Sequence, residues 1–308
     1  MVLKNSMYLL SMGACFLSFL VWPINHSIGD QNSIFSVVSF NVRRDGPEKH
    51  SKNKWKARKW NVEELLKTHL QFSSIICFQE PVLSQVQDIA SFLKNDSYNW
   101  FGKGRGKQWL GMAKNEYLPI FFDAKRFNFI DGGSFVLNKG THNPFKWKKH
   151  GKLLRIATWV HLFDHITKKA IFVYNIHLDH DYDSVRFRSV KVLISHINAH
   201  VKQDQMVFVA GDFNTGFDGK IKQLFHDNGF FHTRTLAQSI NGPINTAIDW
   251  DGKEKYCIDH ILVRPGIYSP SILNYTTVNT VELFWNAHCP LNVLPSDHYP
   301  VLATIQID

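Results

Sequence analysis

The sequence lacks several features that would assign it to a specialised class of protein. It has only 4 cysteines in 308 residues, and none of them has the CxxC spacing of a structural zinc site. No proline-, glycine- or serine-rich linker marks a domain boundary, so the length allows either two domains or one large one. With 44% hydrophobic and 14% aromatic residues, the chain can bury a large core, which excludes a disordered protein.

Acidic and basic residues are absent between Lys4 and Asp30, where the chain contains the apolar run NSMYLLSMGACFLSFLVWPI. A signal peptide needs an apolar region of roughly 7 to 15 residues and a membrane span needs about 20, and this run lies between the two. We therefore expect residues 1–29 to be a cleaved signal peptide, an uncleaved membrane anchor or a buried N-terminal segment. The first two alternatives imply a protein that is exported to the periplasm or medium, or is associated with a membrane through this segment.

The remaining cysteines are Cys77, Cys257 and Cys289. In an exported protein Cys257 and Cys289 could form a disulfide, because each lies close to one of the motifs described below. Cys77 follows an apolar run and is expected to be a buried, apolar residue.

Basic residues outnumber acidic ones, 35 to 26, and give a net charge of +9. This charge favours an anionic partner, such as nucleic acid, a phosphorylated small molecule or an acidic membrane surface. The runs SKNKWKARKW (51–60) and PFKWKKHGK (144–152) combine basic and aromatic residues. They could follow a nucleic-acid backbone and stack on its bases, or form a solvated basic face with tryptophan packed inward.

Short apolar or alternating runs recur along the rest of the chain and are typical of β-strands. Nine strands are expected, at 34–42, 73–80, 118–123, 127–137, 155–163, 170–178, 206–213, 257–263 and 300–307. Helical spacing appears around Val62 and Val190, and a third helix is expected at 83–94. These elements indicate an α/β layered domain with helices on the outer faces of sheets, and two packed sheets would explain why some strands alternate while others are wholly apolar.

Polar side chains stand at or near the ends of these expected strands, where a sheet can hold a site rigidly and leave it open to solvent. Each has an ordinary alternative role as a turn former, a solvated acid or a core histidine. The residues are Asn41, Glu80, Glu116, His177, Asp212, Asn214, Asp259, Asp297 and His298.

Taken together, their order and contexts resemble the endonuclease/exonuclease/phosphatase (deoxyribonuclease I-like) superfamily, from Asn41 to the closing SDHYPV. The runs RIATWV and NIHLDH are most similar to a bacterial subgroup near the deadenylase branch. The resemblance implies that residues 30–308 form one domain, a four-layer αββα sandwich of two mixed β-sheets flanked by helices. It also implies divalent-metal-dependent hydrolysis of a phosphate ester, in which an activated water attacks in line.

The resemblance assigns a role to each acidic or amide residue near the reacting phosphate. Glu80 would be the principal Mg²⁺ ligand, supported by Asn41 and Asp297, with Mn²⁺ as an alternative ion. Asp212 would orient or deprotonate the attacking water, and Asn214 would contact a phosphate oxygen or aid that water. A hard cation on oxygen ligands suits this chemistry because it neutralises an anionic ester that otherwise repels a nucleophile.

Two histidines complete the set that the resemblance implies. His298 would hydrogen-bond the phosphate, with Asp259 holding its ring, and His177 would assist the leaving group, with Glu116 as its carboxylate partner. A carboxylate behind a histidine fixes its tautomer and raises its basicity.

Three functions are consistent with the sequence. A phosphodiesterase acting on nucleic acid accounts best for the full set of acids and histidines together with the positive charge. A phospholipid or sphingolipid phosphodiesterase would explain the N-terminal apolar run beside exposed tryptophan and lysine. The third alternative is a secreted binding module without catalysis, although none of the catalytic positions is replaced. The family's short polar loop after FNVRRD is here GPEKHSKNKWKARKW, so a change in substrate preference is expected at this loop.

Overall fold

A computed structural model describes residues 33–70, 75–94, 97–106, 115–141, 143–285 and 292–307. The expected signal or anchor at residues 1–29 lies outside the described residues, as does Cys289, the expected partner of Cys257. Within the described ranges, no helix is long and apolar enough to cross a membrane.

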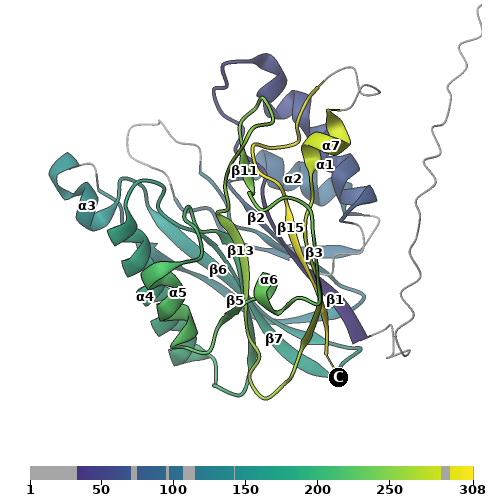
Figure 1. Cartoon of the computed structure of the whole chain (residues 1–308), viewed down its shortest axis with the longest axis vertical. Coiled ribbons are helices and arrows are strands. Elements are labelled where there is room, and N and C mark those ends of the chain that lie inside the picture. The colour runs from purple at the N-terminus through teal and green to yellow at the C-terminus, as the bar shows by residue number, and fades with distance from the viewer. Residues whose placement is uncertain are drawn as a thin grey trace, which may run out of the picture. The chain divides into compact units, whose positions relative to one another are not determined.

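Two large β-sheets form the centre of the domain (Figure 1). The first consists of β1 (Ile34–Asn41), β2 (Ile75–Gln79), β3 (Tyr98–Phe101), β4 (Ile120–Asp123), β10 (Ser239–Asn241), β14 (Ser271–Thr277) and β15 (Val301–Gln306), in the order β10-β14-β15-β1-β2-β4-β3. The second consists of β5 (Phe127–Asn138), β6 (Arg155–Asp164), β7 (Lys169–His177), β8 (Met206–Asp212), β9 (Phe231–His232) and β13 (Asp259–Arg264), in the order β5-β6-β7-β8-β13-β9. A small hairpin-like sheet pairs β11 (Ala247–Ile248) with β12 (Glu254–Tyr256).

Both large sheets are mixed. In the first, β1 pairs in parallel with β2 and antiparallel with β15. In the second, β8 pairs in parallel with β7 and antiparallel with β13. All nine strands expected from the sequence are present, together with shorter or more polar ones that were not expected.

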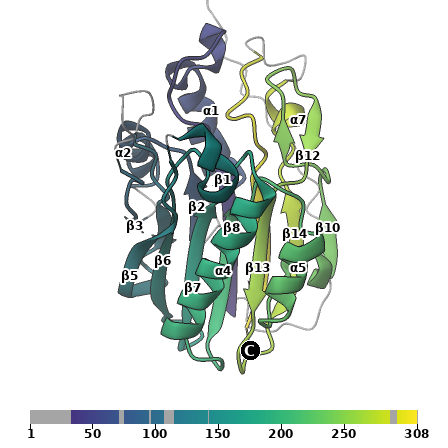
Figure 2. The same ribbon diagram turned by 90° about the vertical axis from the view of Figure 1, so that its left-hand side faces the viewer.

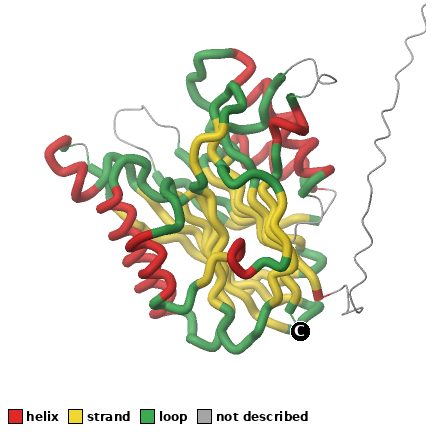
Figure 3. The backbone as a smooth tube through the Cα atoms, in the orientation of Figure 1, coloured by secondary structure: helices red, strands yellow, loops and turns green. Residues whose placement is uncertain are grey.

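Helices cover the outer face of each sheet, as the red segments on opposite sides of the strands show (Figure 3). The first sheet carries α1 (Trp55–Thr68), α2 (Leu83–Phe92) and α7 (Thr280–Phe284), and the second carries α4 (Asp183–His200) and α5 (Gly219–His226), which lie in front of the strands in Figure 2. Short helical segments are η2 (Ser51–Asn53), η4 (Pro144–Lys146), α3 (Trp147–His150) and α6 (Thr233–Leu236). The predicted four-layer αββα sandwich is confirmed.

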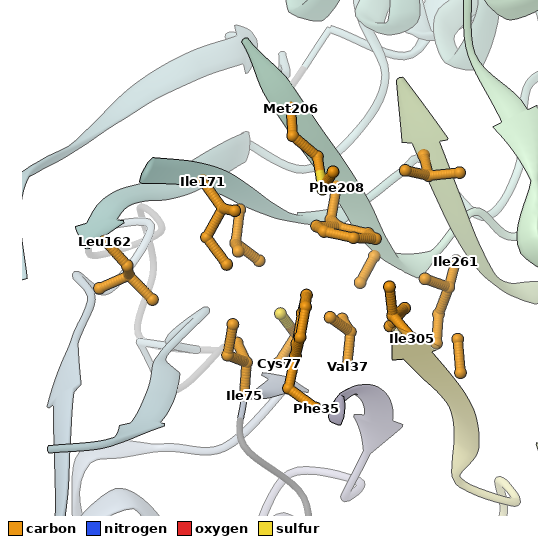
Figure 4. Packing of buried hydrophobic residues seen from close by; sticks show 14 of the residues in the cluster. Phe35, Val37, Ile75, Cys77, Leu162, Ile171, Met206, Phe208, Ile261 and Ile305 are labelled. Atoms are coloured by element: carbon orange, nitrogen blue, oxygen red, sulfur yellow. The ribbon is translucent and has the colours of Figure 1, made fainter. Parts of the chain in front are cut away.

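The core explains why the central strands are almost continuously apolar. On β1, Phe35 and Val37 pack between the two sheets, whereas Val38 packs toward the helical layer. On the facing sheet, Met206 and Phe208 of β8 point into the same space between the sheets (Figure 4). Because both faces of these strands are buried, apolar residues are favoured at nearly every position.

A buried polar link joins the two sheets close to the strand ends that carry the candidate site. The Gln79 side chain donates to Asn175 Oδ1 at 2.8 Å. Asn175 Nδ2 in turn donates to the carbonyl oxygens of Phe78 and Pro119, at 2.8 and 3.0 Å. A buried amide costs free energy unless it is hydrogen-bonded, so this link favours one alignment of β2 against β7.

Arg58, the only arginine of the basic run 51–60, is buried and stabilises the fold. Its side chain is 0% exposed. The guanidinium donates to the carbonyl oxygens of Asn53 and Val42, at 2.7 and 2.8 Å, and also to those of Arg43 and Pro295. It thereby holds the loop after β1 against the segment that precedes β15.

We expect Arg58→Met to lower the free energy of unfolding by about 3 kcal/mol, because several buried carbonyl groups lose their donor. The midpoint of urea unfolding measures this loss. Lys56→Met, on the exposed face of the same helix, is the matched control and should leave the midpoint unchanged. Equal midpoints for the two variants would contradict a structural role for Arg58.

A pair of buried histidines lies on β9 and β13. His260 Nε2 donates to the Thr215 carbonyl oxygen at 3.0 Å, so its Nδ1 accepts from His232 Nε2, also at 3.0 Å. His232 Nδ1 accepts from the Arg234 backbone N–H at 3.0 Å. Each ring therefore has one donor and one acceptor nitrogen in use, which is the neutral form of both.

This pair predicts a loss of stability in acid. Burial lowers the pKa of both His232 and His260 below the ordinary value of 6.5. The unfolded chain therefore binds protons that the folded chain does not, and stability falls as the pH drops below about 6.5, by up to about 1.4 kcal/mol per pH unit for each group. Urea midpoints measured at pH 7.5 and pH 5.5 should differ less in His260→Gln than in the wild type or in the exposed-site control His226→Gln. An unchanged difference in His260→Gln would contradict this assignment.

Candidate active site

The topology brings the predicted strand-end residues to one edge of the two sheets. Parallel pairing aligns the ends of β7 and β8, so that His177 lies opposite Asp212. Antiparallel pairing places the first residue of β13, Asp259, opposite Asp212 on its other side. In the facing sheet, Asn41 ends β1 and Glu80 directly follows β2. Side chains from five strand ends or beginnings, and from the segment before β15, therefore meet at this edge.

Asp212 is the centre of the resulting cluster. Asn41 Nδ2 donates to Asp212 Oδ2 at 3.0 Å and to Glu80 Oε1 at 3.1 Å. His177 Nε2 and His298 Nε2 lie 3.5 and 4.0 Å from the same Asp212 oxygen. The predicted residues Asn41, Glu80, His177, Asp212 and His298 are thus brought together.

His298 and Asp259 form the predicted pair. His298 Nδ1 lies 2.9 Å from Asp259 Oδ2, and the Thr246 hydroxyl donates to the same oxygen at 2.6 Å. Burial disfavours the imidazolium, but Asp259, Asp212 and Asp297 outweigh it and raise the pKa of His298 to about 10. His298 is therefore protonated at neutral pH, and its Nε2–H group is available to an anion in the site.

Backbone strain is concentrated at the same place. Arg43, Glu80 and Asn214 all have left-handed backbone conformations, with φ of 55°, 71° and 53°. Such a conformation costs a residue other than glycine about 1–3 kcal/mol, and the surrounding contacts must hold it. For Asn214, these are its backbone N–H donating to Asp212 Oδ1 at 2.8 Å and its side chain donating to the Leu178 carbonyl at 3.2 Å. Asn214 therefore orients Asp212.

The acidic residues can hold a divalent cation. Glu80, His177 and Asp212 each offer a ligand atom, and these atoms all lie within 4.8 Å of one another; Asp212, Asp259 and His298 form a second such group. Burial opposes ionisation of Glu80, but Arg43 and the hydrogen bond from Asn41 lower its pKa to about 2. An ionised carboxylate beside a second carboxylate is a donor set that suits a hard cation.

The two other predicted ligands lie beside these groups. Asn41 turns its amide nitrogen toward Glu80 and Asp212, while its oxygen accepts from the Arg43 backbone N–H at 2.9 Å. Asp297 Oδ2 lies 3.5 Å from Arg43 Nη1, and in the described part of the chain Asp297 belongs to neither group of potential ligands. In this arrangement Asn41 holds the two carboxylates together, and Asp297 is paired with Arg43.

The predicted pairing of Glu116 with His177 is not what the structure shows. Glu116 accepts from Arg105 Nη2 at 2.7 Å and lies 3.8 Å from Arg44 Nη1, and no ion pair joins it to His177 among the described side chains. The reason is local: the Arg105 backbone N–H donates to the Glu116 carbonyl at 2.9 Å, which aligns their side chains. His177 has Asp212 as its carboxylate neighbour, and burial, Arg155 and Arg105 lower its pKa well below 6.5. His177 is therefore neutral.

A cleft of about 460 Å³ opens above the cluster. It is lined by six of the predicted residues and by further ones that the sequence analysis did not select, namely Arg43, Arg44, Arg105, Arg155, His180 and Leu153. The arginines were counted only in the net charge of the chain, although Arg155 opens the run RIATWV as the first residue of β6. The position of Arg155 at the beginning of an expected strand was the sequence feature that pointed to it as a site residue.

Comparison with known proteins agrees with the fold. The chain matches the model of the Endonuclease/Exonuclease/phosphatase family over residues 38–298. An endonuclease/exonuclease/phosphatase from Bacteroides vulgatus is 27% identical, with a TM-score of 0.72 over 89% of this chain and 99% of that one. No curated protein sequence matches this chain.

Two further solved structures share the fold at lower identity. A mannosyl-6-phosphatase from Bacteroides thetaiotaomicron is 24% identical, with a TM-score of 0.71 over 89% of this chain and 99% of that one. The human Nocturnin catalytic domain, with a bound sulfate anion, is 16% identical, with a TM-score of 0.66 over 90% and 95% of the two chains. The family predicted from the sequence is confirmed: the chain belongs to the endonuclease/exonuclease/phosphatase family and is a phosphoesterase with a candidate metal site.

Proposed function

We propose that this protein is a Mg²⁺-dependent phosphodiesterase that acts on nucleic acid. The main support for the proposal is that two groups lie close to Asp212. One is Glu80, a carboxylate able to hold a cation, and the other is His298, a protonated histidine. These groups supply what in-line attack on an anionic ester requires: charge neutralisation, a base for water and a donor for the developing negative charge.

Each step follows from the side chains at the cluster. Glu80, with Asn41 and Asp297 nearby, would hold Mg²⁺, and the ion would neutralise the phosphate and favour attack. Burial and the neighbouring Asp259 raise the pKa of Asp212. A carboxylate with a raised pKa is a stronger base than an exposed one, so Asp212 is suited to accept a proton from the attacking water.

The histidines act on the phosphate oxygens. Protonated His298 donates from Nε2 to an oxygen on which charge develops, while Asp259 holds its ring through Nδ1. His177 is neutral and can donate one N–H hydrogen bond, so it positions an oxygen and does not supply a proton of its own to the leaving group. Asn214 keeps Asp212 in the orientation that the attack needs.

The choice of nucleic acid as substrate is supported by charge around the cleft. Four arginines line it, and the chain as a whole carries a net charge of +9. The segment η4–α3, which runs into the cleft residues Leu153 and Arg155, exposes three lysines and also Phe145, which is 97% exposed. A basic segment with an exposed aromatic ring suits a phosphate backbone and an unpaired base.

Incubation of the purified protein with plasmid DNA, single-stranded DNA and RNA tests the proposal. We expect cleavage of at least one of them with Mg²⁺, loss of cleavage with excess EDTA, and recovery when Mg²⁺ or Mn²⁺ is restored. If none of the three polymers is cleaved with either ion, the proposed nuclease activity is wrong.

A further inference from the structure

Two buried arginines in the cleft have hydrogen-bonding groups that no described residue uses. Arg105 and Arg155 are only 5% and 3% exposed, and both line the cleft. Arg105 uses Nη2 to bind Glu116 at 2.7 Å, and Arg155 uses Nη2 to contact His180 Nδ1 at 3.1 Å. Nε and Nη1 of both side chains are buried without a hydrogen-bond partner among the described residues.

The positive charge of this pair is only partly balanced. Among the described residues, Glu116 is the only carboxylate that forms an ion pair with Arg105, and it is shared with Arg44, whose Nη1 lies 3.8 Å away. Of the described side chains, only that of His180 is hydrogen-bonded to the Arg155 guanidinium, and the pKa of this histidine is lowered by burial and by Arg155 itself. Burial and the charge of Arg155 lower the pKa of Arg105 to about 10. A buried guanidinium group with unused donors costs free energy unless an anion accepts its hydrogen bonds.

Arg105 and Arg155 lie beside the residues that are proposed to hold the cation and the phosphate. Arg105 and Arg155 share a small recess with Glu80 and His177 at the floor of the cleft. Arg155 and Arg105 are also the charges that act most strongly on His177. An anion bound by the two arginines is therefore next to the cation site and not on a separate surface.

We propose that Arg105 and Arg155 form a subsite for a terminal, dianionic phosphate group of the substrate. The proposal rests on phosphoester hydrolysis at this site, not on the diesterase activity proposed above, and it specifies the substrate. An internal diester has one negative charge, which a divalent cation at Glu80 already neutralises. A terminal phosphate has two charges and three free oxygens, and planar guanidinium groups bind such oxygens in pairs.

Two kinds of substrate supply this group. The terminal phosphate is either the one that is hydrolysed, as in a phosphomonoester, or a second phosphate next to a scissile diester, as at the phosphorylated end of an oligonucleotide. Two pairs of compounds separate them: p-nitrophenyl phosphate against bis(p-nitrophenyl) phosphate, and one oligonucleotide with a 5′-phosphate against the same oligonucleotide with a 5′-hydroxyl.

Binding is tested first, without catalysis. Calorimetric titration of the full-length protein with inorganic phosphate in EDTA removes any cation that could hold the anion. We expect binding to the wild type, and a dissociation constant about 10- to 100-fold higher in Arg155→Met. Arg264→Met is the matched control, because Arg264 is also buried but lies outside this cleft, and it should bind phosphate as the wild type does. Arg155→Lys keeps the charge without the planar group, and serves if Arg155→Met does not fold; we expect weakened binding there as well.

Specificity is tested next. In the wild type, kcat/KM should favour the terminal phosphate by about 10-fold or more in one of the two pairs, and Arg155→Met should lose most of that preference while Arg264→Met keeps it. The subsite is refuted if phosphate does not bind in EDTA, or if Arg155→Met and Arg155→Lys bind it as tightly as the wild type. Preferences equal in wild type and variant for both pairs also refute it. A failure of the proposed activity is distinguishable from a failure of the subsite. In that case the protein would still bind phosphate but would hydrolyse none of the compounds.

Discussion

Asp212→Asn is expected to lower kcat by about 10³- to 10⁴-fold with Mg²⁺ present, because the substitution removes the base that accepts a proton from water. Asparagine has the same shape and keeps an oxygen for the Asn214 backbone N–H, which donates to Asp212 Oδ1 at 2.8 Å. The contact with Asn214 is therefore preserved, while an amide group replaces the basic oxygen that accepts from Asn41. Steady-state hydrolysis of the best substrate found in the DNA and RNA panel measures the effect.

The stability of this variant separates chemistry from folding. Burial and Asp259 raise the pKa of Asp212 above that of an unfolded aspartate. The folded state therefore binds protons more tightly than the unfolded one, and the ionised carboxylate destabilises the fold increasingly as the pH rises past the ordinary value of 3.8. Asp212→Asn should accordingly unfold in EDTA at the same temperature as the wild type or higher. Asp218→Asn, at an exposed position, is the control for activity. An Asp212→Asn enzyme with more than a tenth of wild-type kcat would rule out Asp212 as the base.

The central strands were predictable because they bury both faces. In β8, for example, Met206 and Phe208 face the other sheet while Val207 and Val209 face α4 and α5. A short, wholly apolar run of β-branched and aromatic residues that ends at a turn is typical of a buried strand. β14 was not expected, because Ser271–Thr277 contains polar residues on partly exposed positions and owes its conformation to pairing with β15. Long-range pairing of this kind leaves little trace in local sequence.

The candidate site also contains some residues whose roles were predictable from the sequence and others whose roles were not. Asn41, Glu80 and Asp212 were predictable because each stands where an apolar strand ends, and parallel strands end at one edge of a sheet. The pairing of Glu116 with Arg105 was not predictable. It depends on two segments that meet through a backbone hydrogen bond between these residues. Resemblance assigned Glu116 to His177, and the sequence contains no local signal that Arg105 competes for it.

Glu80→Gln is expected to raise the Mg²⁺ concentration for half-maximal activity by at least about 10- to 100-fold, because a neutral amide replaces the ionised carboxylate at the cation site. The second readout needs no substrate. A cation that binds only the folded state raises the unfolding temperature as its concentration exceeds the dissociation constant. The wild type should therefore unfold at a higher temperature in millimolar Mg²⁺ than in EDTA, and Glu80→Gln should lose most of this difference.

The difference between the two conditions is the informative quantity, because Glu80 also stabilises the fold without a cation. Arg43 and Asn41 lower its pKa from 4.5 to about 2, so the ionised side chain contributes stability above pH 4.5 that is lost as the pH falls toward 2. In EDTA at pH 7, Glu80→Gln should thus unfold at a lower temperature than the wild type, the opposite of Asp212→Asn. Glu63→Gln, on the surface of α1, is the control. If Mg²⁺ stabilises Glu80→Gln as much as the wild type, the cation is held elsewhere, and the assignment of Glu80 as its ligand fails.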